Sequence, residues 1–442
     1  MNTALEISNP QNTVNVLETT KSVCPQCLKV IDAEIVVDQG AVYMEKNCSE
    51  HGSYRPYLWP DADHYMWLKS FESKSLLPGH PKPAENGCPT DCGLCVSHLH
   101  HPRLVELELT HRCNLRCPLC FMSAGDNEKN LPADLSLDEI EAQLHMIMEQ
   151  AGPQTSIQLT GGEPTIRKDL ADIVKLCKKV GFSAIEVNTN GIAIGRNPDY
   201  IKHLAAAGIT GIYMQFDGLS DDIYQIIRGK DLLRIKLQAL EYCRAANVQV
   251  VLSMAVIKGV NDTQLGNMLR FALGNIDVIA GVAYQPAFIS GRSDLGAEHP
   301  LTMGDVIFSL AAQSNGIIRP HDLWPTGCSH PLCDSTTYII RQPAGKYQSI
   351  GQLINVDEYR NHNHTDSPQG SVLPDMAHQS YPDLDPRGLS ILIMNYMSAL
   401  DLNLDRLQQC SMTVADPDGN LIPFCAYQLT NVDGLKSHEI NS

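Results

Sequence analysis

The 442-residue chain has no uninterrupted apolar run of the ~18 residues that a membrane-spanning helix requires. Its first segment, Met1 to Thr20, is polar and lacks the apolar core of a signal peptide. We therefore expect a cytoplasmic protein without a transmembrane span, and the sequence leaves a membrane-peripheral position open.

Positive charge is also scarce. The chain has 33 Lys and Arg against 50 Asp and Glu, which gives a net charge of −17. A negative field of this size opposes nonspecific binding to nucleic acids and to anionic lipid headgroups. The sequence has no basic patch interleaved with aromatic residues either, so we expect no nucleic-acid partner.

Cysteine, in contrast, is abundant, with 15 residues. A reducing cytosol disfavours stable disulfides, and a chain of this length does not need them, so clustered cysteines indicate bound metal. Cys177 and Cys243 stand alone in helix-like stretches and are interpreted as small buried hydrophobic residues. The other thirteen fall into groups.

The middle of the chain alternates β-rich runs with helical patterns. Ser136 and Glu139 have the spacing of a capping box at the start of the first helix. Six such units predict a parallel sheet, either open or closed into a partial barrel. The expected strands are Leu104–Thr110, Ser156–Thr160, Ala184–Thr189, Gly211–Phe216, Val248–Ala255 and Val278–Tyr284. The expected helices are Leu137–Gln150, Arg167–Lys179, Pro198–Ala206, Asp221–Ala246 and Thr263–Leu273.

Two later segments have less regular patterns. Val356–Asp385 is polar and rich in Pro and His, which predicts a long surface loop. Gly388–Leu400 is apolar and rich in Met, which favours a core helix of about twelve residues over an alkyl tunnel or a bilayer contact.

The strongest chemical signal is the loop Cys113-Asn-Leu-Arg-Cys117-Pro-Leu-Cys120, directly after the first strand. Three thiolates on one loop can bind three irons of a [4Fe–4S] cluster and leave the fourth iron open. A loop after a parallel strand also lies at the sheet edge where α/β active sites occur. Zinc is the weaker alternative, because a tetrahedral zinc site prefers paired elements and four ligands.

The second strand ends in Gly161-Gly162-Glu163-Pro164. Two glycines let a ligand approach the backbone closely, and the glutamate and the following helix start could hold an amine and a carboxylate. Taken alone, this segment is equally consistent with an ordinary strand-to-helix turn.

Together, the Cys-x₃-Cys-x₂-Cys loop and the Gly-Gly-Glu-Pro segment resemble the radical S-adenosylmethionine (SAM) superfamily. The resemblance implies a partial (βα)₆ barrel, with SAM on the open iron of the cluster. One electron then cleaves SAM into methionine and a 5′-deoxyadenosyl radical, which takes hydrogen from an unactivated carbon. The chain departs from many members at Leu119, where those members have an aromatic residue.

The same resemblance implies that polar residues at later strand ends contact SAM. The alternative for each is ordinary turn or cap chemistry. The expected cofactor-binding residues are Gly161, Gly162, Glu163, Pro164, Asn188, Asn190, Gln215, Asp217 and Ser253.

The remaining cysteines form three groups. Cys24, Cys27, Cys48 and His51 have the spacing of a mononuclear site that would close a small β knob, with rubredoxin-like iron or structural zinc as the metal. The second group repeats the Cys-x₃-Cys-x₂-Cys spacing without the strand before it, and the third is dispersed near the C-terminus. Their partition between auxiliary iron–sulfur clusters is left open; the residues are Cys88, Cys92, Cys95, Cys328, Cys333, Cys410 and Cys425.

This whole arrangement, over about residues 21–428, is most similar to the archaeal tetraether lipid synthases and their bacterial relatives, a group also described as pterin methyltransferases. The resemblance implies hydrogen abstraction followed by carbon–carbon coupling of lipid chains. Methyl or methylene transfer to a pterin and peptide modification are alternatives within the superfamily. A zinc-binding structural or nucleic-acid-binding protein is the alternative outside it. The implied partners are SAM, a substrate that is a lipid, a pterin or a peptide, and a low-potential electron donor such as ferredoxin or flavodoxin.

The expected domain organisation follows from these groups. It comprises an N-terminal metal-binding knob over 1–77, a linker and auxiliary-cluster segment over 78–103, the radical SAM partial barrel over 104–290, and a C-terminal auxiliary-cluster and substrate region over 291–442.

Overall fold

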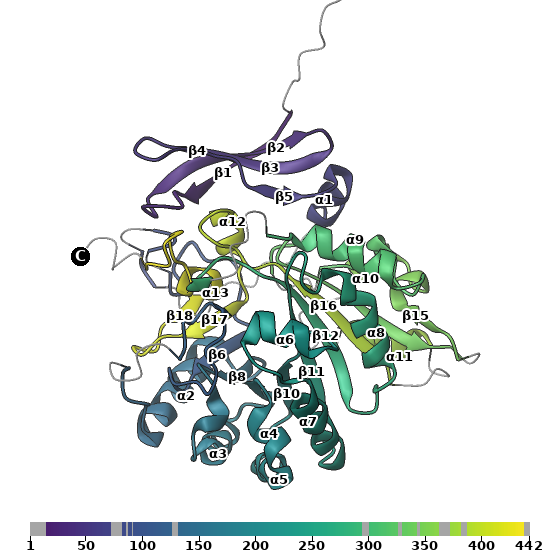
Figure 1. The fold of residues 1–442 in the computed structure, drawn as a ribbon. Helices are drawn as coiled ribbons and strands as arrows, with labels where there is room; N and C mark the ends of the chain where they lie inside the picture. Colours follow the sequence, from purple (N-terminus) through teal and green to yellow (C-terminus); the bar gives the residue numbers. More distant parts are fainter. Residues whose placement is uncertain are drawn as a thin grey trace, which may run out of the picture.

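The computed structural model describes residues 15–71, 82–84, 87–90, 92–125, 131–293, 300–325, 329–342, 345–361, 372–381 and 387–436. They form a small antiparallel β unit near the N-terminus, drawn in purple, that lies over one end of a large α/β unit (Figure 1). In this part of the chain no helix has the length and apolar character needed to cross a bilayer.

The α/β unit is built on an eleven-stranded sheet with the order β15-β14-β16-β12-β11-β10-β9-β8-β6-β17-β18. The strands from β16 to β17 in this order are parallel, and antiparallel pairs extend the sheet at both ends. The outermost strands, β15 and β18, do not pair with each other in the described chain, so the sheet is a partial barrel. The strands are β6 (Leu104–Glu108), β8 (Ser156–Thr160), β9 (Ile185–Thr189), β10 (Gly211–Gln215), β11 (Val250–Val256), β12 (Ile279–Pro286), β14 (Asp334–Arg341), β15 (Tyr347–Ser349), β16 (Leu389–Met394), β17 (Met412–Ala415) and β18 (Leu421–Pro423).

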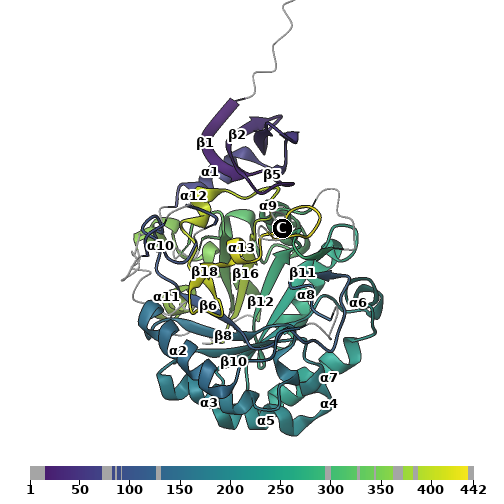
Figure 2. The ribbon, with the colours of Figure 1, turned by 90° about the vertical axis from the view of Figure 1, so that its left-hand side faces the viewer.

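Helices follow the parallel strands and cover the outer face of the sheet (Figure 2). The predicted capping box is present, because Ser136 Oγ accepts from the Glu139 N–H and Glu139 accepts from the Ser136 N–H. The helices are α2 (Leu137–Ala151), α3 (Leu170–Val180), α4 (Ile192–Arg196), α5 (Pro198–Ala207), α6 (Asp221–Arg228), α7 (Leu233–Ala245), α8 (Leu265–Leu273) and α9 (Met303–Gln313), with short 3₁₀ turns η2 (Pro164–Ile166), η3 (Asp262–Gln264), η4 (Pro320–Asp322) and η5 (Ile350–Gln352).

The single helix predicted over Asp221–Ala246 is wrong, because the chain forms two helices there. Gly229 has a φ of +72° and ends α6 in the left-handed conformation that glycine adopts readily. Asp221 then accepts from the N–H groups of Leu232 and Leu233, which starts α7. The isolated cysteines Cys177 and Cys243 are fully buried in α3 and α7, as predicted.

Two predictions for the C-terminal third are also wrong. Within Val356–Asp385 the chain forms α10 (Val356–Asn361) and α11 (Val372–Ser380), and Tyr359, Leu373 and Met376 are buried. Residues 362–371 and 382–386 of that segment lie outside the described chain. The apolar segment Gly388–Leu400 contains the strand β16 instead of a helix, because alternate residues of it bury themselves in the core.

The N-terminal unit is an antiparallel sheet of the strands β1 (Asn15–Val23), β2 (Val30–Asp38), β3 (Ala41–Cys48), β4 (Gly52–Tyr54) and β5 (Tyr57–Trp59), followed by α1 (Ala62–Lys69). It is fixed to the larger unit by buried contacts. Lys46 Nζ donates to the Ala399 carbonyl at 2.9 Å, and Thr20 donates to Asp405 at 2.8 Å near α12 (Leu404–Leu407). Gly304 in α9 lies directly against the Trp59 ring.

Candidate active site at the carboxyl end of the parallel strands

The three-cysteine loop continues from β6. The sulfur-bearing residues Cys113, Cys117 and Cys120 are all half-buried and line the same cavity. The Leu115 N–H donates to Cys113 Sγ at 3.4 Å, which orients the first thiol.

A second segment holds this loop in place. The short strand β7 (Leu119–Cys120) pairs with β13 (Arg292–Ser293). The buried guanidinium of Arg292 donates to the carbonyls of Cys117 and Ala124, both at 2.7 Å. The loop geometry therefore depends on the chain after β12, which is far away in sequence.

The cavity beside the loop has a volume of about 660 Å³. Its walls are the inward-facing residues of the parallel strands from β6 to β12 and β16. An aromatic and methionine-rich side, with Phe121, Phe288, Met394, Tyr396 and Phe424, faces the C-terminal region. The cavity therefore has one polar wall and one apolar wall.

The two glycines of the Gly-Gly-Glu-Pro segment are required by close backbone packing. The N–H of Gly162 donates to the Thr110 carbonyl at 2.8 Å, and the N–H of Glu163 donates to the Arg112 carbonyl at 2.9 Å. A Cβ on Gly161 would lie 2.4 Å from the Thr110 oxygen, and one on Gly162 would lie 2.3 Å from the Arg112 oxygen. These glycines join the second strand end to the start of the cysteine loop and also line the cavity.

Glu163 is buried, and its carboxylate accepts several hydrogen bonds from protein groups. It accepts from Thr189 Oγ1 at 2.7 Å and from the backbone N–H groups of Asn190 at 2.8 Å and Thr165 at 3.1 Å. The following Pro164 begins η2, is buried, and does not line the cavity. Glu163 therefore ties the end of β8 to the end of β9, and its predicted contact with the cofactor stays a prediction.

The other predicted cofactor residues divide into two sets. Asn188, Asn190, Gln215 and Ser253 line the cavity. Asn190 donates to Asn114 inside the cysteine loop at 2.7 Å, so it connects the end of β9 to that loop.

Asp217, in contrast, is fully buried away from the cavity. Its carboxylate is paired with the Arg228 guanidinium at 2.8 and 2.9 Å. The structure therefore places Asp217 behind a cavity residue rather than against a ligand.

Sequence reasoning missed two cations beside Asp217, namely its partner Arg228 and the nearby Lys236. Arg228, from α6, lines the cavity, and its charge and hydrogen bond act to lower the pKa of the Cys117 thiol against the opposing effect of burial. Lys236, from α7, is fully buried and donates to the carbonyls of Asn190 at 2.8 Å and Gln215 at 2.6 Å. Burial lowers the pKa of Lys236 to about 7. The signal for both residues was a basic side chain on the apolar face of a predicted helix.

Sequence reasoning also missed the carboxylates and the tyrosine of the polar wall. Glu106, Glu186 and Tyr213 line the cavity from β6, β9 and β10. Burial raises the pKa of Glu106 to about 8, and it also raises the pKa of Glu186. Charged residues inside strands that are otherwise buried were the available signal.

The donor set fits an iron–sulfur cluster better than a single ion. Burial raises the pKa of the Cys113 thiol to about 12 and that of Cys117 above its usual range, so these thiols need a metal to ionise. In the described residues only the N-terminal group brings three or more ligand atoms within 4.8 Å of one another. Cys113, Cys117 and Cys120 do not meet this criterion, which agrees with a polynuclear cluster, where each thiolate binds a different iron.

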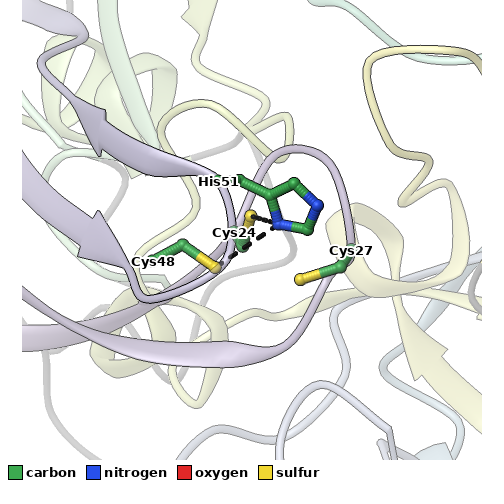
Figure 3. Close-up of side chains that lie close together, drawn as sticks. All are labelled: Cys24, Cys27, Cys48 and His51. Atoms are coloured by element: carbon green, nitrogen blue, oxygen red, sulfur yellow. Dashed lines mark hydrogen bonds between the residues drawn. The ribbon is translucent and has the colours of Figure 1, made fainter.

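The ligand atoms of the N-terminal cysteine and histidine group, in contrast, lie close together (Figure 3). Cys24, Cys27, Cys48 and His51 offer ligand atoms that all lie within 4.8 Å of one another. The sulfurs of Cys24 and Cys48 each lie 3.5 Å from His51 Nδ1. A tetrahedral ion with metal–sulfur and metal–nitrogen bonds of about 2.3 and 2.05 Å would separate these atoms by about 3.6 Å. This site therefore fits one tetrahedral ion.

The described C-terminal cysteines lie close to the second cysteine group, which consists of Cys88, Cys92 and Cys95. The thiol of Cys92 is close enough to Cys88, Cys95 and Cys410 for each to raise its pKa. In the same way Cys410 is affected by Cys425 and Cys333. Cys328 lies outside the described residues. The structure thus brings six of the seven thiols into one region, and their division between clusters stays a prediction.

Comparison with known proteins agrees with this geometry. Residues 107–272 match the radical SAM superfamily, and residues 16–60 match the HMPTM N-terminal zinc ribbon domain. The chain is 31% identical to the 7,8-dihydro-6-hydroxymethylpterin dimethyltransferase of Methanocaldococcus jannaschii, over 92% of each chain. It is 32% identical to the GTP 3′,8-cyclase of Staphylococcus saprophyticus over 38% of this chain and 50% of that protein.

Among solved structures, SuiB of Streptococcus suis bound to S-adenosylmethionine is similar over 50% of this chain and 48% of that chain, with 15% identity and a TM-score of 0.42. The sequence-based resemblance is confirmed for the superfamily and for the pterin methyltransferase group, and the zinc ribbon match favours zinc in the N-terminal knob. The chain is a radical SAM enzyme, with a [4Fe–4S] cluster and SAM as cofactors, and it belongs to the family of the pterin dimethyltransferase.

Proposed function

We propose that this enzyme adds methyl groups to a reduced pterin bound in the cavity beside Cys113, Cys117 and Cys120. For each methyl group, one SAM is cleaved to 5′-deoxyadenosine and methionine, and a second SAM gives its methyl to the pterin carbon that has lost hydrogen and leaves as S-adenosylhomocysteine. An external donor supplies two electrons for this sequence. The observation that carries the proposal is the polar wall of that cavity, which holds Glu106, Glu186 and several amides. The relative that aligns over 92% of the chain is a pterin dimethyltransferase, which supports the same substrate class.

Each cofactor has assigned residues in this proposal. We assign the cluster to the thiolates of Cys113, Cys117 and Cys120, and the methionine end of SAM to Gly161, Gly162 and Glu163, which line the same cavity. When bound and reduced, the cluster supplies the electron that cleaves SAM and so generates the 5′-deoxyadenosyl radical. We propose a low-potential ferredoxin or flavodoxin as the source of that electron.

The protein around the cofactors orients and shields them. Arg292 fixes the cysteine loop through two carbonyls, and Asn190 links that loop to β9 through Asn114. The aromatic wall packs Phe121 against Phe288 and Phe424, with ring centroids 5.9 and 5.6 Å apart, which excludes water from that side.

Carbon–carbon coupling of lipid chains is the second candidate, and the apolar wall of the same cavity favours it. Phe288, Met394 and Met412 could contact an alkyl chain. An alkyl chain would, however, leave the Glu106 carboxyl group of the same cavity without a hydrogen-bond partner, at a cost of about 1–3 kcal/mol. A compact substrate with polar edges avoids this cost. A membrane-peripheral position belongs to this second candidate.

The test is product analysis under anaerobic conditions. The reconstituted enzyme is incubated with SAM, dithionite and 7,8-dihydro-6-hydroxymethylpterin, and both 5′-deoxyadenosine and the mass of the pterin are measured. We expect 5′-deoxyadenosine together with a pterin that has gained one or two methyl groups. Unmodified pterin, with coupled chains formed from added lipid, would instead establish the second candidate.

A further inference from the structure

The cavity contains a buried carboxylate that no protein group satisfies. Glu106 is 4% exposed and lines the cavity. In the described part of the chain its carboxylate has no hydrogen-bond partner, whereas Glu108, two residues later, accepts from Tyr427 at 3.0 Å and Gln428 at 3.4 Å. Because the Glu106 carboxyl group lines the cavity and has no partner among the described residues, its oxygens are free to accept hydrogen bonds from a ligand.

Glu106 is the first member of a polar row. Glu106 pairs in register with Gln158 of β8, and Gln158 pairs with Glu186 of β9. All three line the cavity, since residues at one level of adjacent parallel strands face the same side. The Gln158 amide is already engaged, because it donates to Glu186 at 3.1 Å and accepts from Asn188 at 3.4 Å.

Other polar groups converge on the same level. The Tyr213 hydroxyl accepts from Gln285 at 2.9 Å, and burial raises the pKa of Tyr213, with smaller contributions from the charges of Glu186 and Glu106. Tyr213 therefore lies close to both carboxylates. This end of the cavity offers acceptor oxygens from two strands and few free donors.

We propose that Glu106 binds the donor edge of the substrate, an HN–C–NH₂ group such as that of a 2-amino-4-oxopyrimidine ring. Glu186 makes the neighbouring contact with the same substrate. The two parallel N–H donors of such an edge match the two oxygens of a carboxylate, and their donation favours the ionised form of Glu106 against the protonated form that burial favours in the empty cavity. This inference rests on the proposed function for the identity of the ligand, a reduced pterin, but it assigns the recognition to a particular residue.

The experiment is a binding measurement without turnover. The reconstituted enzyme is titrated anaerobically with 7,8-dihydro-6-hydroxymethylpterin and with the analogue in which oxygen replaces the 2-amino group. The wild type should bind 7,8-dihydro-6-hydroxymethylpterin more tightly than the analogue that lacks the 2-amino group. Glu106→Gln should weaken the binding of 7,8-dihydro-6-hydroxymethylpterin by about ten- to hundredfold, which is the range for hydrogen bonds to a charged group. It should also remove much of the preference for the 2-amino compound.

Glu108→Gln is the matched control, because it alters a carboxylate of the same strand that does not line the cavity, and it should bind as the wild type does. Glu186→Gln should give a smaller loss than Glu106→Gln, since Gln158 already donates to Glu186. Iron and sulfide per chain, measured for each variant, verify that the site is loaded.

The outcomes separate the two proposals. If Glu106→Gln binds and discriminates like the wild type while the wild type methylates the pterin, the inference is wrong and the proposed function stands. If Glu106→Gln loses binding but the wild type leaves the pterin unmodified, the inference stands and the methyl-transfer proposal fails. A wild type that binds neither pterin overturns both.

Discussion

The two cysteine sites of this chain differ in how the scaffold spaces their ligands. In the N-terminal knob, turns at the ends of β1 and β3 bring four ligand atoms within 4.8 Å of one another, and two of the three sulfurs are on buried residues. In the barrel, one loop after β6 presents three half-buried thiols to a cavity of about 660 Å³. Both sites use cysteines that are separated by two or three intervening residues.

The difference shows that cysteine spacing alone does not specify the chemistry. The knob closes its ligand shell with His51, so a single ion has no open position. The barrel loop supplies three thiols and leaves the rest of the site to a cavity. The following predictions test this contrast, beginning with the largest effect.

Cys113→Ala should abolish 5′-deoxyadenosine formation, because the cluster loses one of its three protein ligands. The measurement is SAM cleavage with dithionite, after iron and sulfide analysis. Cleavage at the wild-type rate would contradict the assignment of the loop.

Cys48→Ser should remove about one zinc per chain and loosen the N-terminal sheet, since a structural zinc contributes directly to folding. Elemental analysis and limited proteolysis of residues 15–71 would measure both effects. Iron and sulfide per chain should stay near the wild-type values. Loss of iron in place of zinc would contradict the structural role of the knob.

Asp217→Asn should destabilise the barrel by about 3 kcal/mol, because it leaves the Arg228 guanidinium, which is only partly exposed at the cavity, without its counter-charge. Chemical denaturation measures this change. The surface variant Lys202→Met breaks an exposed ion pair with Asp199 and should change stability by less than about 1 kcal/mol. Equal effects from the two variants would contradict the buried role of Asp217.

Acidification should weaken the contact between the knob and the barrel. His64 in α1 packs against Phe308 of α9 with ring centroids 5.0 Å apart, and burial lowers its pKa to about 4. The unfolded chain therefore binds more protons than the folded chain between about pH 6.5 and 4, so stability falls as the pH falls through this window.

The loss expected from His64 is about 2–3 kcal/mol. Denaturation curves at several pH values would measure it. His64→Phe should reduce the pH dependence, and an unchanged slope in that variant would assign it to other groups.

Gly162→Ala should cost about 1–3 kcal/mol and lower cluster loading, because its Cβ would collide with the Arg112 carbonyl beside Cys113. Gly211→Ala is the control, since its Cβ would meet the Gln249 oxygen at an ordinary 3.6 Å. Thermal unfolding and iron content measure the two effects. Normal stability and loading in Gly162→Ala would show that the turn can rearrange.

The sequence predicts the regular middle of the chain well. The strands from β6 to β12 and the capping box of Ser136 follow from local patterns of apolar residues and cap residues. The break at Gly229 was not predicted, because the apolar periodicity continues across it. The sequence predicts a helix where β16 forms, since a short apolar run fits both, and the pairing of β16 with β12 and β14 decides.

The site is predictable only where its residues form a contiguous motif. The cysteine loop and the Gly-Gly-Glu-Pro segment are short and local. Glu106 and Arg228, in contrast, line the cavity from two separate elements, and Arg292 holds the cysteine loop from a third. The position of Asp217 at a strand end predicts a cofactor-binding residue, but its carboxylate forms an ion pair with Arg228. Such partners depend on tertiary packing, which local patterns do not contain.

The most direct test of the contrast between the two sites is metal analysis combined with SAM cleavage on one anaerobic preparation. We predict about one zinc per chain, about four irons with matching sulfide for the barrel cluster, further iron if the auxiliary cysteines are loaded, and 5′-deoxyadenosine that depends on SAM and dithionite. Zinc at more than one site, without iron, sulfide or 5′-deoxyadenosine, would contradict the account.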